Sequence, residues 1–183
     1  MSLRVDLYPI AMPKLTALFG VDGWTHGRAI IDELRAKGRK LDDSLVDELL
    51  SGRLRASQPA IEDAALAALI GALAYHVREP APAVMFDVGG PWNGLEAITA
   101  ALPDPERALH DVLLHGRPLV GATLRSDWNR YAWIASTELD TFDRLLARID
   151  RTPRGMAFML EDELLPWLVE VRASGAAVFV SIG

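Results

Sequence analysis

The chain of 183 residues contains no cysteine. This absence excludes disulfide bridges, thiolate nucleophiles and cysteine-based zinc sites. The sequence also lacks an apolar run of the roughly 20 residues that a membrane-spanning helix needs. Residues 1–6 do not combine a basic region with a long apolar one, so we expect no signal peptide. Together these absences favour a cytoplasmic protein that acts away from membranes.

Motifs that identify common enzyme classes are missing as well. There is no G-x-S-x-G elbow for a serine nucleophile, no H-E-x-x-H zinc motif, and no glycine-rich phosphate loop of either common type. His76 and Glu79 have a spacing that metal sites use, but a metal needs further ligands. A hydrogen-bonded structural histidine is the favoured interpretation of His76. We therefore expect no metal and no cofactor, and we name no catalytic residue from these motifs.

Negative charge is concentrated in the middle of the chain. Residues 58–115 carry two basic and eight acidic residues, which accounts for the whole net charge of −6 because the flanking thirds nearly balance. No basic stripe of the kind that binds a phosphate backbone is present, so we expect no nucleic acid partner. The acidic third favours a basic protein partner, unless these acids only keep the surface soluble.

Three segments far apart in the sequence have the patterns of β-strands. Leu3, Val5 and Leu7 alternate with polar residues, which indicates a half-buried strand near residues 2–9. Residues 129–135 form a second candidate, and the nearly unbroken apolar run at 176–182 is typical of a central strand covered on both faces. Because strands need partners for their backbone groups, we expect all three in one sheet. Residues 83–86 fit either a strand or a loop.

Helical patterns fill most of the remaining sequence. Residues 58–78 give the clearest one, with Pro59 in the first turn, Arg78 near the end and no charged residue from 64 to 77. A helix that is apolar nearly all round is a buried one, so we place it at the centre of the core. Apolar stripes and caps predict further helices at about 13–19, 27–37, 42–52, 92–102, 104–116, 137–149 and 161–174.

These patterns predict one α+β domain over residues 1–183. Its core would be a small mixed β-sheet with strands near 2–9, 129–135 and 176–182. Seven or eight helices would pack this sheet around the buried helix 58–78.

Two aromatic segments are the candidates for a binding surface. Residues 125–133 combine two tryptophans, a tyrosine and two arginines, which are the residue types that anchor protein interfaces. We expect Trp24, Trp92 and Trp128 to be exposed, because each borders Gly, Asn or Asp. Tyr131 and Trp133 share one strand face and are equally compatible with a core. The predicted binding residues are Trp92, Asn93, Glu96, Arg125, Asp127, Trp128, Arg130 and Tyr131.

Several short motifs follow one another in a recognisable order. They are the strand at 3–7, Trp92-Asn93-Gly94-Leu95, Tyr131-Ala132-Trp133-Ile134, Ser136-Thr137-Glu138-Leu139, and the run from Leu168 through Ser174-Gly175 into the strand at 178–182. In this order of elements the chain resembles the YfbM-like bacterial domains of unknown function. The resemblance extends over nearly the whole chain, although the helix at 42–52 and the Arg117-Pro118 loop have no match. It implies a compact α+β fold and carries over no activity.

Two functions from different classes fit this sequence. The first is a protein-binding module, most concretely an immunity-type protein that sequesters a bacterial toxin or another basic partner. The second is a small-ligand-binding protein or enzyme with a pocket between the Trp92 helix and residues 125–133. There Glu96 or Asp127 would be the acid–base group, and Arg125 would hold an anion. A homodimer with facing apolar patches is a third possibility.

Overall fold

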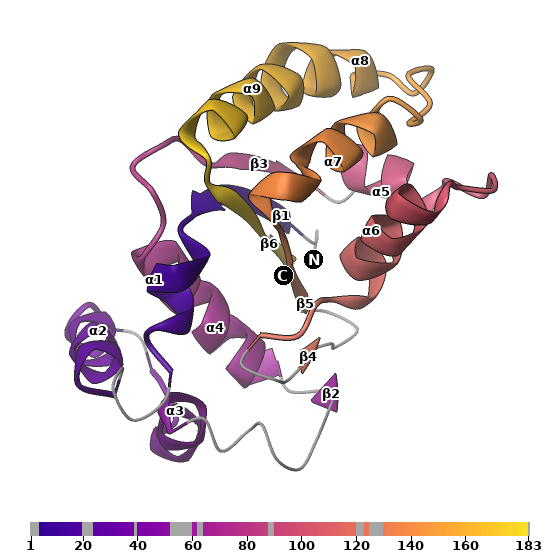
Figure 1. Cartoon of the computed structure of the whole chain (residues 1–183). Helices are drawn as coiled ribbons and strands as arrows, with labels where there is room; N and C mark the ends of the chain where they lie inside the picture. Colours follow the sequence, from indigo (N-terminus) through magenta and orange to yellow (C-terminus); the bar gives the residue numbers. More distant parts are fainter. Residues whose placement is uncertain are drawn as a thin grey trace.

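A four-stranded sheet brings the two ends of the chain together. The computed structural model describes residues 4–19, 24–38, 40–51, 60–61, 64–87, 90–119, 123–124 and 130–182. Strands β1 (Arg4–Ile10) and β6 (Ala177–Ile182) lie side by side at the centre of the sheet. Strands β3 (Val84–Asp87) and β5 (Arg130–Ile134) flank them in the order β3-β1-β6-β5, and all three pairings are antiparallel (Figure 1). The pairing of β6 with both β1 and β5 confirms that the three predicted strands lie in one sheet.

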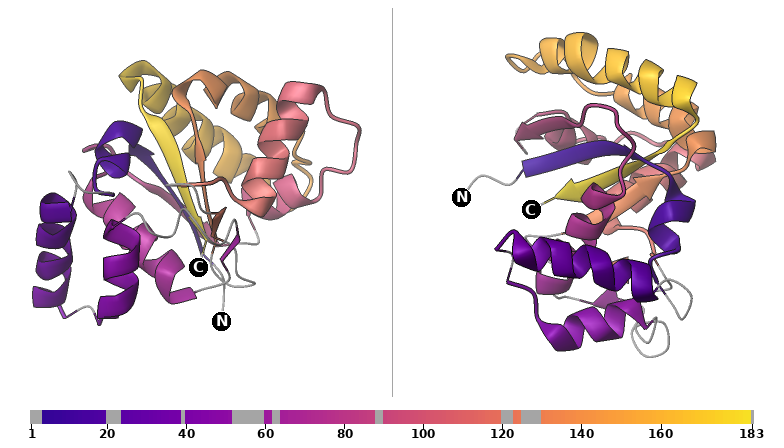
Figure 2. Two further views of the ribbon diagram at one scale, coloured as in Figure 1. Left: turned by 60° about the horizontal axis from the view of Figure 1, so that its bottom comes forward. Right: turned by 90° about the vertical axis from the view of Figure 1, so that its left-hand side faces the viewer.

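Helices cover both faces of this sheet (Figures 1 and 2). One layer holds α5 (Pro91–Glu96), α6 (Asp104–His115), α7 (Leu139–Leu146), α8 (Met156–Phe158) and α9 (Leu165–Ser174). The other layer holds α1 (Met12–Thr16), α2 (Trp24–Ala36), α3 (Asp43–Leu50) and α4 (Ala64–His76). We call them the upper and lower layers, after their places in Figure 1. None of the helices in the described part of the chain is long and apolar enough to cross a membrane.

Alternation along the strands creates a separate core on each face of the sheet. Val178 and Val180 of β6 point into the upper core, whereas Phe179 between them points into the lower core. The same period of two sends Leu7 of β1 upward and Tyr8 downward. Since β6 is covered on both faces and paired on both edges, only Ser181 interrupts its apolar run. This confirms the prediction of a central strand at 176–182.

The lower face of the sheet carries a row of aromatic rings. Phe179 lies between Tyr8 and Tyr131, with ring centroids 5.4 and 5.7 Å apart and the rings nearly parallel. The Tyr8 hydroxyl donates a hydrogen bond of 3.2 Å to the carbonyl of Gly71 in α4. Burial raises the pKa of both tyrosines far above the ordinary value of 10, so both hydroxyls stay protonated and act as structural groups.

Helix α4 is shorter than the sequence pattern predicts. Leu69, Ile70 and Leu73 are buried in the lower core, which confirms that this helix is a core element. Residues 60 and 61, however, form strand β2 (Ala60–Ile61), which pairs in parallel with β4 (Thr123–Leu124). The prediction of a helix starting at 58 is therefore wrong, because pairing with β4 holds this stretch extended. The parallel pair is separate, so the main sheet is wholly antiparallel rather than mixed.

The last helical stretch widens before a proline. Residues Met159–Leu164 form a π-helix between α8 and α9, so residues 156–174 are helical throughout. Pro166 lacks an N–H group, and its ring crowds the carbonyl four residues earlier, at Asp162. A wide turn before it relieves both problems. The helix therefore starts five residues earlier than the acidic residues at 161–163 predict, just after Gly155 with its positive φ of 83°.

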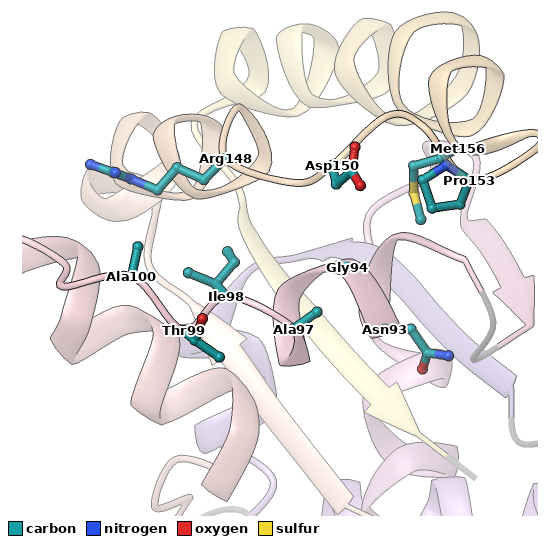
Figure 3. A pocket seen from close by; sticks show the side chains of 10 residues that line it. All are labelled: Asn93, Gly94, Ala97, Ile98, Thr99, Ala100, Arg148, Asp150, Pro153 and Met156. Carbon is teal, nitrogen blue, oxygen red and sulfur yellow. The ribbon is translucent and has the colours of Figure 1, made fainter.

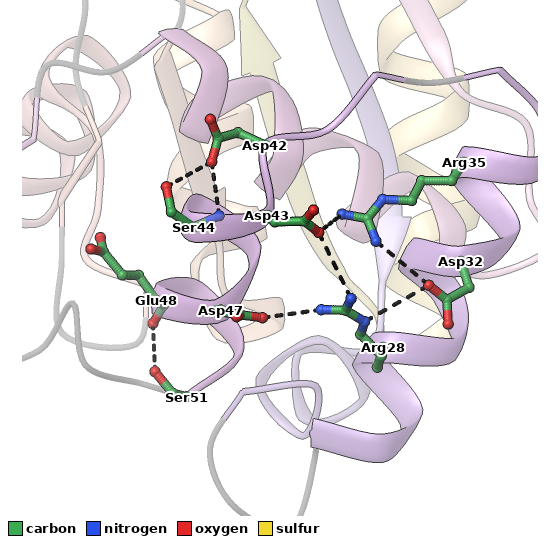
Figure 4. Close-up of polar contacts among 9 residues, drawn as sticks. All are labelled: Arg28, Asp32, Arg35, Asp42, Asp43, Ser44, Asp47, Glu48 and Ser51. Atoms are coloured by element: carbon green, nitrogen blue, oxygen red, sulfur yellow. Dashed lines mark hydrogen bonds and ion pairs between the residues drawn. The ribbon is translucent and has the colours of Figure 1, made fainter.

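An exposed ionic network joins α2 to α3 in the lower layer (Figure 4). Arg28 forms ion pairs with Asp47 at 3.0 Å and with Asp43 at 3.8 Å, and Arg35 also contacts Asp43. The helix α3 begins as predicted, with Asp42 accepting a 2.8 Å hydrogen bond from the backbone N–H of Ser44. Because exposed ion pairs contribute only about 0–1 kcal/mol each, this network orients α2 and α3 more than it stabilises them.

The central position of Phe179 leads to a stability prediction. We expect Phe179→Ala to lower the free energy of unfolding by about 3–5 kcal/mol, because the ring is fully buried and stacks on two neighbours. Urea unfolding followed by circular dichroism measures this. The matched control is Phe158→Ala, an exposed phenylalanine, which should change stability by less than about 0.5 kcal/mol. Equal losses in the two variants would contradict this assignment of the core.

Candidate functional site

A cavity of about 740 Å³ lies in the upper layer beside α5. One wall is α5 with the turn after it, and the other is the segment that leads from α7 to α8 (Figure 3). Ala97, Ile98, Pro153 and Met156 provide apolar lining. Its volume lies within the roughly 300–1,000 Å³ of small-molecule pockets. The cavity is therefore large enough for a small organic molecule with an apolar body.

The polar lining of this cavity consists of Asn93, Thr99, Arg148 and Asp150. Arg148 lies at one end, above Ala100, and Asn93 lies at the other end (Figure 3). Asp150 accepts hydrogen bonds from Thr152, at 2.9 Å from the backbone N–H and 2.6 Å from the hydroxyl. The cavity thus offers one cation, one carboxylate that already has partners, one amide and one hydroxyl.

A buried carboxylate orients Arg148. Only 7% of the Glu106 side chain is exposed, and its Oε2 accepts a 2.6 Å hydrogen bond from Arg148 Nε. The other oxygen, Oε1, accepts a 3.3 Å bond from Arg144 Nε. Glu106 belongs to α6, Arg144 to α7 and Arg148 to the turn after it, so these bonds join two helices at the cavity. Two guanidinium groups share one carboxylate, which leaves an excess of positive charge.

A second feature of the upper layer is the outer side of the helical stretch 156–174. We call the exposed Phe158, Asp162, Glu163, Val169 and Glu170 the acidic helix face. Phe158 and Val169 are 57% and 59% exposed. Asp162, Glu163 and Glu170 form no ion pair with any described residue, whereas Glu161 pairs with Arg151 at 3.1 Å. Arg172, the one base of this stretch, turns to Asp140 and Asp143 of α7.

Several described acids of the middle third, where the charge distribution indicates an acidic face, have partners within the chain. Glu79 pairs with Lys14, Glu106 pairs with Arg144 and Arg148, and Asp111 pairs with His115. Folding therefore neutralises Glu79 and Glu106 with bases from outside this third, whereas the Asp111–His115 contact is an ion pair only when the histidine is protonated. Glu62 and Asp63 lie outside the described residues.

The structure places the predicted binding residues in different environments. Trp92 is only 1% exposed and belongs to the upper core, so the expectation of an exposed Trp92 is wrong. Its neighbour Asn93 is exposed and lines the cavity, and Glu96 is exposed on the same helix. In α5 the indole of Trp92 faces the sheet and the side chain of Asn93 lies on the surface, as expected of an amphipathic helix.

Tyr131 lies on the opposite side of the sheet from Trp92. It is buried in the lower core and stacks on Phe179, as the core interpretation of the sequence allows. Trp92 and Tyr131 therefore cannot contribute to one surface. Arg125, Asp127 and Trp128 lie outside the described residues, as does the side chain of Arg130, whose backbone is in β5. Their proposed role in binding stays a prediction.

Sequence reasoning missed the residues that define both features. Arg148, Asp150 and Met156 line the cavity, and Phe158 and Val169 belong to the acidic helix face. A signal for Arg148 did exist: Arg144 and Arg148 are four apart and so share one side of a helix. Their partner Glu106 is 38 and 42 residues away, and no local pattern connects it to them.

Among the described residues, no group of three or more His, Asp or Glu side chains is placed to hold a metal ion. No protein-family model, curated protein or solved structure matches this chain. The cavity and the acidic helix face are therefore the two features of the described chain that bear on function.

The ion pairs of Glu106 lead to a prediction about pH. The hydrogen bond from Arg148 holds the pKa of the Glu106 carboxyl below its ordinary value of 4.5, although burial opposes this. The ion pairs therefore stabilise the fold above about pH 4.5, and this contribution is lost as the pH falls through the lowered pKa. We expect Arg148→Gln to raise the Glu106 pKa, measured by carbon-13 NMR of its carboxyl. Arg144→Gln should raise it less, because its bond is longer, and identical pKa values in all three proteins would contradict this.

Close packing of α5 against the end of α7 gives a second prediction. A Cβ at Gly94 would overlap the side chain of Ile149, whereas one at Gly71 in α4 would lie 3.4 Å from Ser181 Oγ. We expect Gly94→Ala to cost about 1–3 kcal/mol in unfolding free energy, because α5 has to move. Gly71→Ala should be neutral or stabilise by up to about 1 kcal/mol, because alanine favours a helix interior. Thermal unfolding measures both, and a harmless Gly94→Ala would show that α5 packs loosely.

Proposed function

We propose that this chain is a protein-binding module that takes a basic partner on the acidic helix face. One observation carries the proposal: two exposed apolar side chains, Phe158 and Val169, lie on one helix among carboxylates that have no partner in the described chain. Exposed apolar groups beside polar ones are typical of surfaces that bind other proteins.

The other large apolar side chains that are exposed in the described part of the chain, Tyr75 and Met85, already have partners within the chain. Tyr75 carries the Arg78 guanidinium over its ring at 3.7 Å, and the Met85 sulfur accepts a 2.7 Å hydrogen bond from Arg4. Phe158 and Val169 have no cation over them within the described chain. A basic partner would contact Phe158 and Val169 in the way that Arg78 and Arg4 of this chain contact Tyr75 and Met85.

Charge favours a basic partner over an acidic one. The stretch 156–174 contains four acids and one base, and that base faces α7. Unpaired acids around apolar anchors raise the rate of association with a positively charged protein and disfavour acidic competitors. Buried apolar anchors would then supply most of the affinity. An immunity-type protein in the bacterial cytoplasm, which blocks the basic cleft of a toxin, is the most specific form of this proposal.

The test of this function begins with affinity capture from a lysate of the host, followed by binding measurements with the purified captured protein. We expect a partner of net positive charge. Phe158→Ala with Val169→Ala should weaken its affinity by about 30-fold, which corresponds to about 2 kcal/mol for lost anchors. Asp162→Asn with Glu163→Gln should slow association by about tenfold, and salt should do the same in the unaltered chain.

The matched control is Glu48→Gln on α3, an exposed acid in the lower layer that forms no ion pair with a described residue. Glu48→Gln should leave the affinity and the association rate unchanged. Capture of an acidic partner would overturn the proposal. So would an affinity of the Phe158→Ala, Val169→Ala variant equal to that of the unaltered chain.

A further inference from the structure

The cavity beside α5 has the features of a second and independent binding site. We propose that it binds a small organic anion with a single negative charge, and that Arg148 holds the charged group. This site is separate from the acidic helix face. It would bind an anion, whereas the acidic helix face would bind a positively charged protein.

The orientation of Arg148 is the first argument. Its Nε donates to the buried Glu106, which fixes the plane of the guanidinium group. The two terminal nitrogens, Nη1 and Nη2, have no partner among the described residues. A guanidinium group that is held at Nε and free at its terminal nitrogens can bind a carboxylate or phosphate through two parallel hydrogen bonds.

The local charge is the second argument. Glu106 carries one negative charge and contacts two arginines, so this end of the cavity keeps a net positive charge. An anion is therefore favoured there and a cation is disfavoured. Asp150, the other charged residue of the lining, opposes further negative charge in the ligand. This is why we assign a monoanion rather than a polyphosphate.

The apolar lining defines the rest of the ligand. Ile98 and Met156 belong to opposite walls of the cavity, and Ala97 and Pro153 add small apolar patches. Burial of an aliphatic chain between them would contribute roughly 25 cal/mol for each Å² of apolar surface removed from water. The chemical class that fits is a carboxylic acid with a short hydrocarbon tail.

Titration with hexanoate, followed by proton–nitrogen NMR of the whole chain, tests this assignment. We expect hexanoate to shift the backbone amide signals of residues 93–100, with a dissociation constant on the order of 1 mM. Hexanol, which has the same tail without the charge, should bind about tenfold more weakly. Inorganic phosphate, which has the charge without the tail, should also bind about tenfold more weakly.

The variants make the test specific to Arg148. Arg148→Gln should weaken hexanoate binding at least tenfold, whereas Arg154→Gln should leave it unchanged, since Arg154 is an exposed base outside the lining. If Arg148→Gln perturbs the fold, Thr99→Glu decides instead, because Thr99 is an exposed lining residue and the new charge should abolish binding.

Three results would overturn the proposal. The first is the absence of shifts at residues 93–100 up to about 10 mM hexanoate. The second is equal binding of phosphate and hexanoate at that place. The third is unchanged hexanoate binding in a folded Arg148→Gln or Thr99→Glu variant.

Discussion

The antiparallel pairing of β1 with β6 is the interaction on which the rest of this structure depends. It joins residues nearly 180 positions apart, such as Val5 and Ile182, and gives β6 a partner on each edge once β5 is added. Both cores are built on this pair, because each strand sends alternate side chains to opposite faces. Bringing such distant segments together has a high entropic cost. The apolar packing of the helices on both faces of the sheet has to offset this cost.

Much of the fold can be predicted from the sequence because the periodic signals are local. The alternation at 3–7 and the apolar run at 176–182 identify strands whose positions the structure confirms. The stripe of Leu69, Ile70 and Leu73 correctly identifies a core helix. Boundaries that depend on distant partners fail: Ala60 and Ile61 are extended only because Thr123 and Leu124 lie beside them. No pattern within a few residues of position 60 contains that information.

The candidate sites could be predicted less well, and Trp92 shows why. Its polar neighbours favour exposure, but the rotation of a six-residue helix against the sheet decides which side chain is buried. Charge is equally non-local. The middle third holds the net negative charge of the chain, yet Lys14, Arg144 and Arg148 from outside that third reach its acids. Acids without an ion-pair partner among the described residues remain on the last helix, in a third that is nearly neutral by count. Which acids keep an ion-pair partner is therefore decided by folding rather than by composition.

The wide turn at Met159–Leu164 determines the phase of the last helix. Four of its buried residues, Met156, Leu160, Leu164 and Leu168, recur every fourth position. In a regular α-helix of 3.6 residues per turn, each such step would rotate the side chain by about 40° away from the sheet. Underwinding of one turn cancels part of this drift, so these four residues stay on the buried side of the helix over three turns. Removal of a single residue there would tighten the wide turn toward an ordinary α-turn, and the helical segments on either side would keep almost the same orientation toward the sheet.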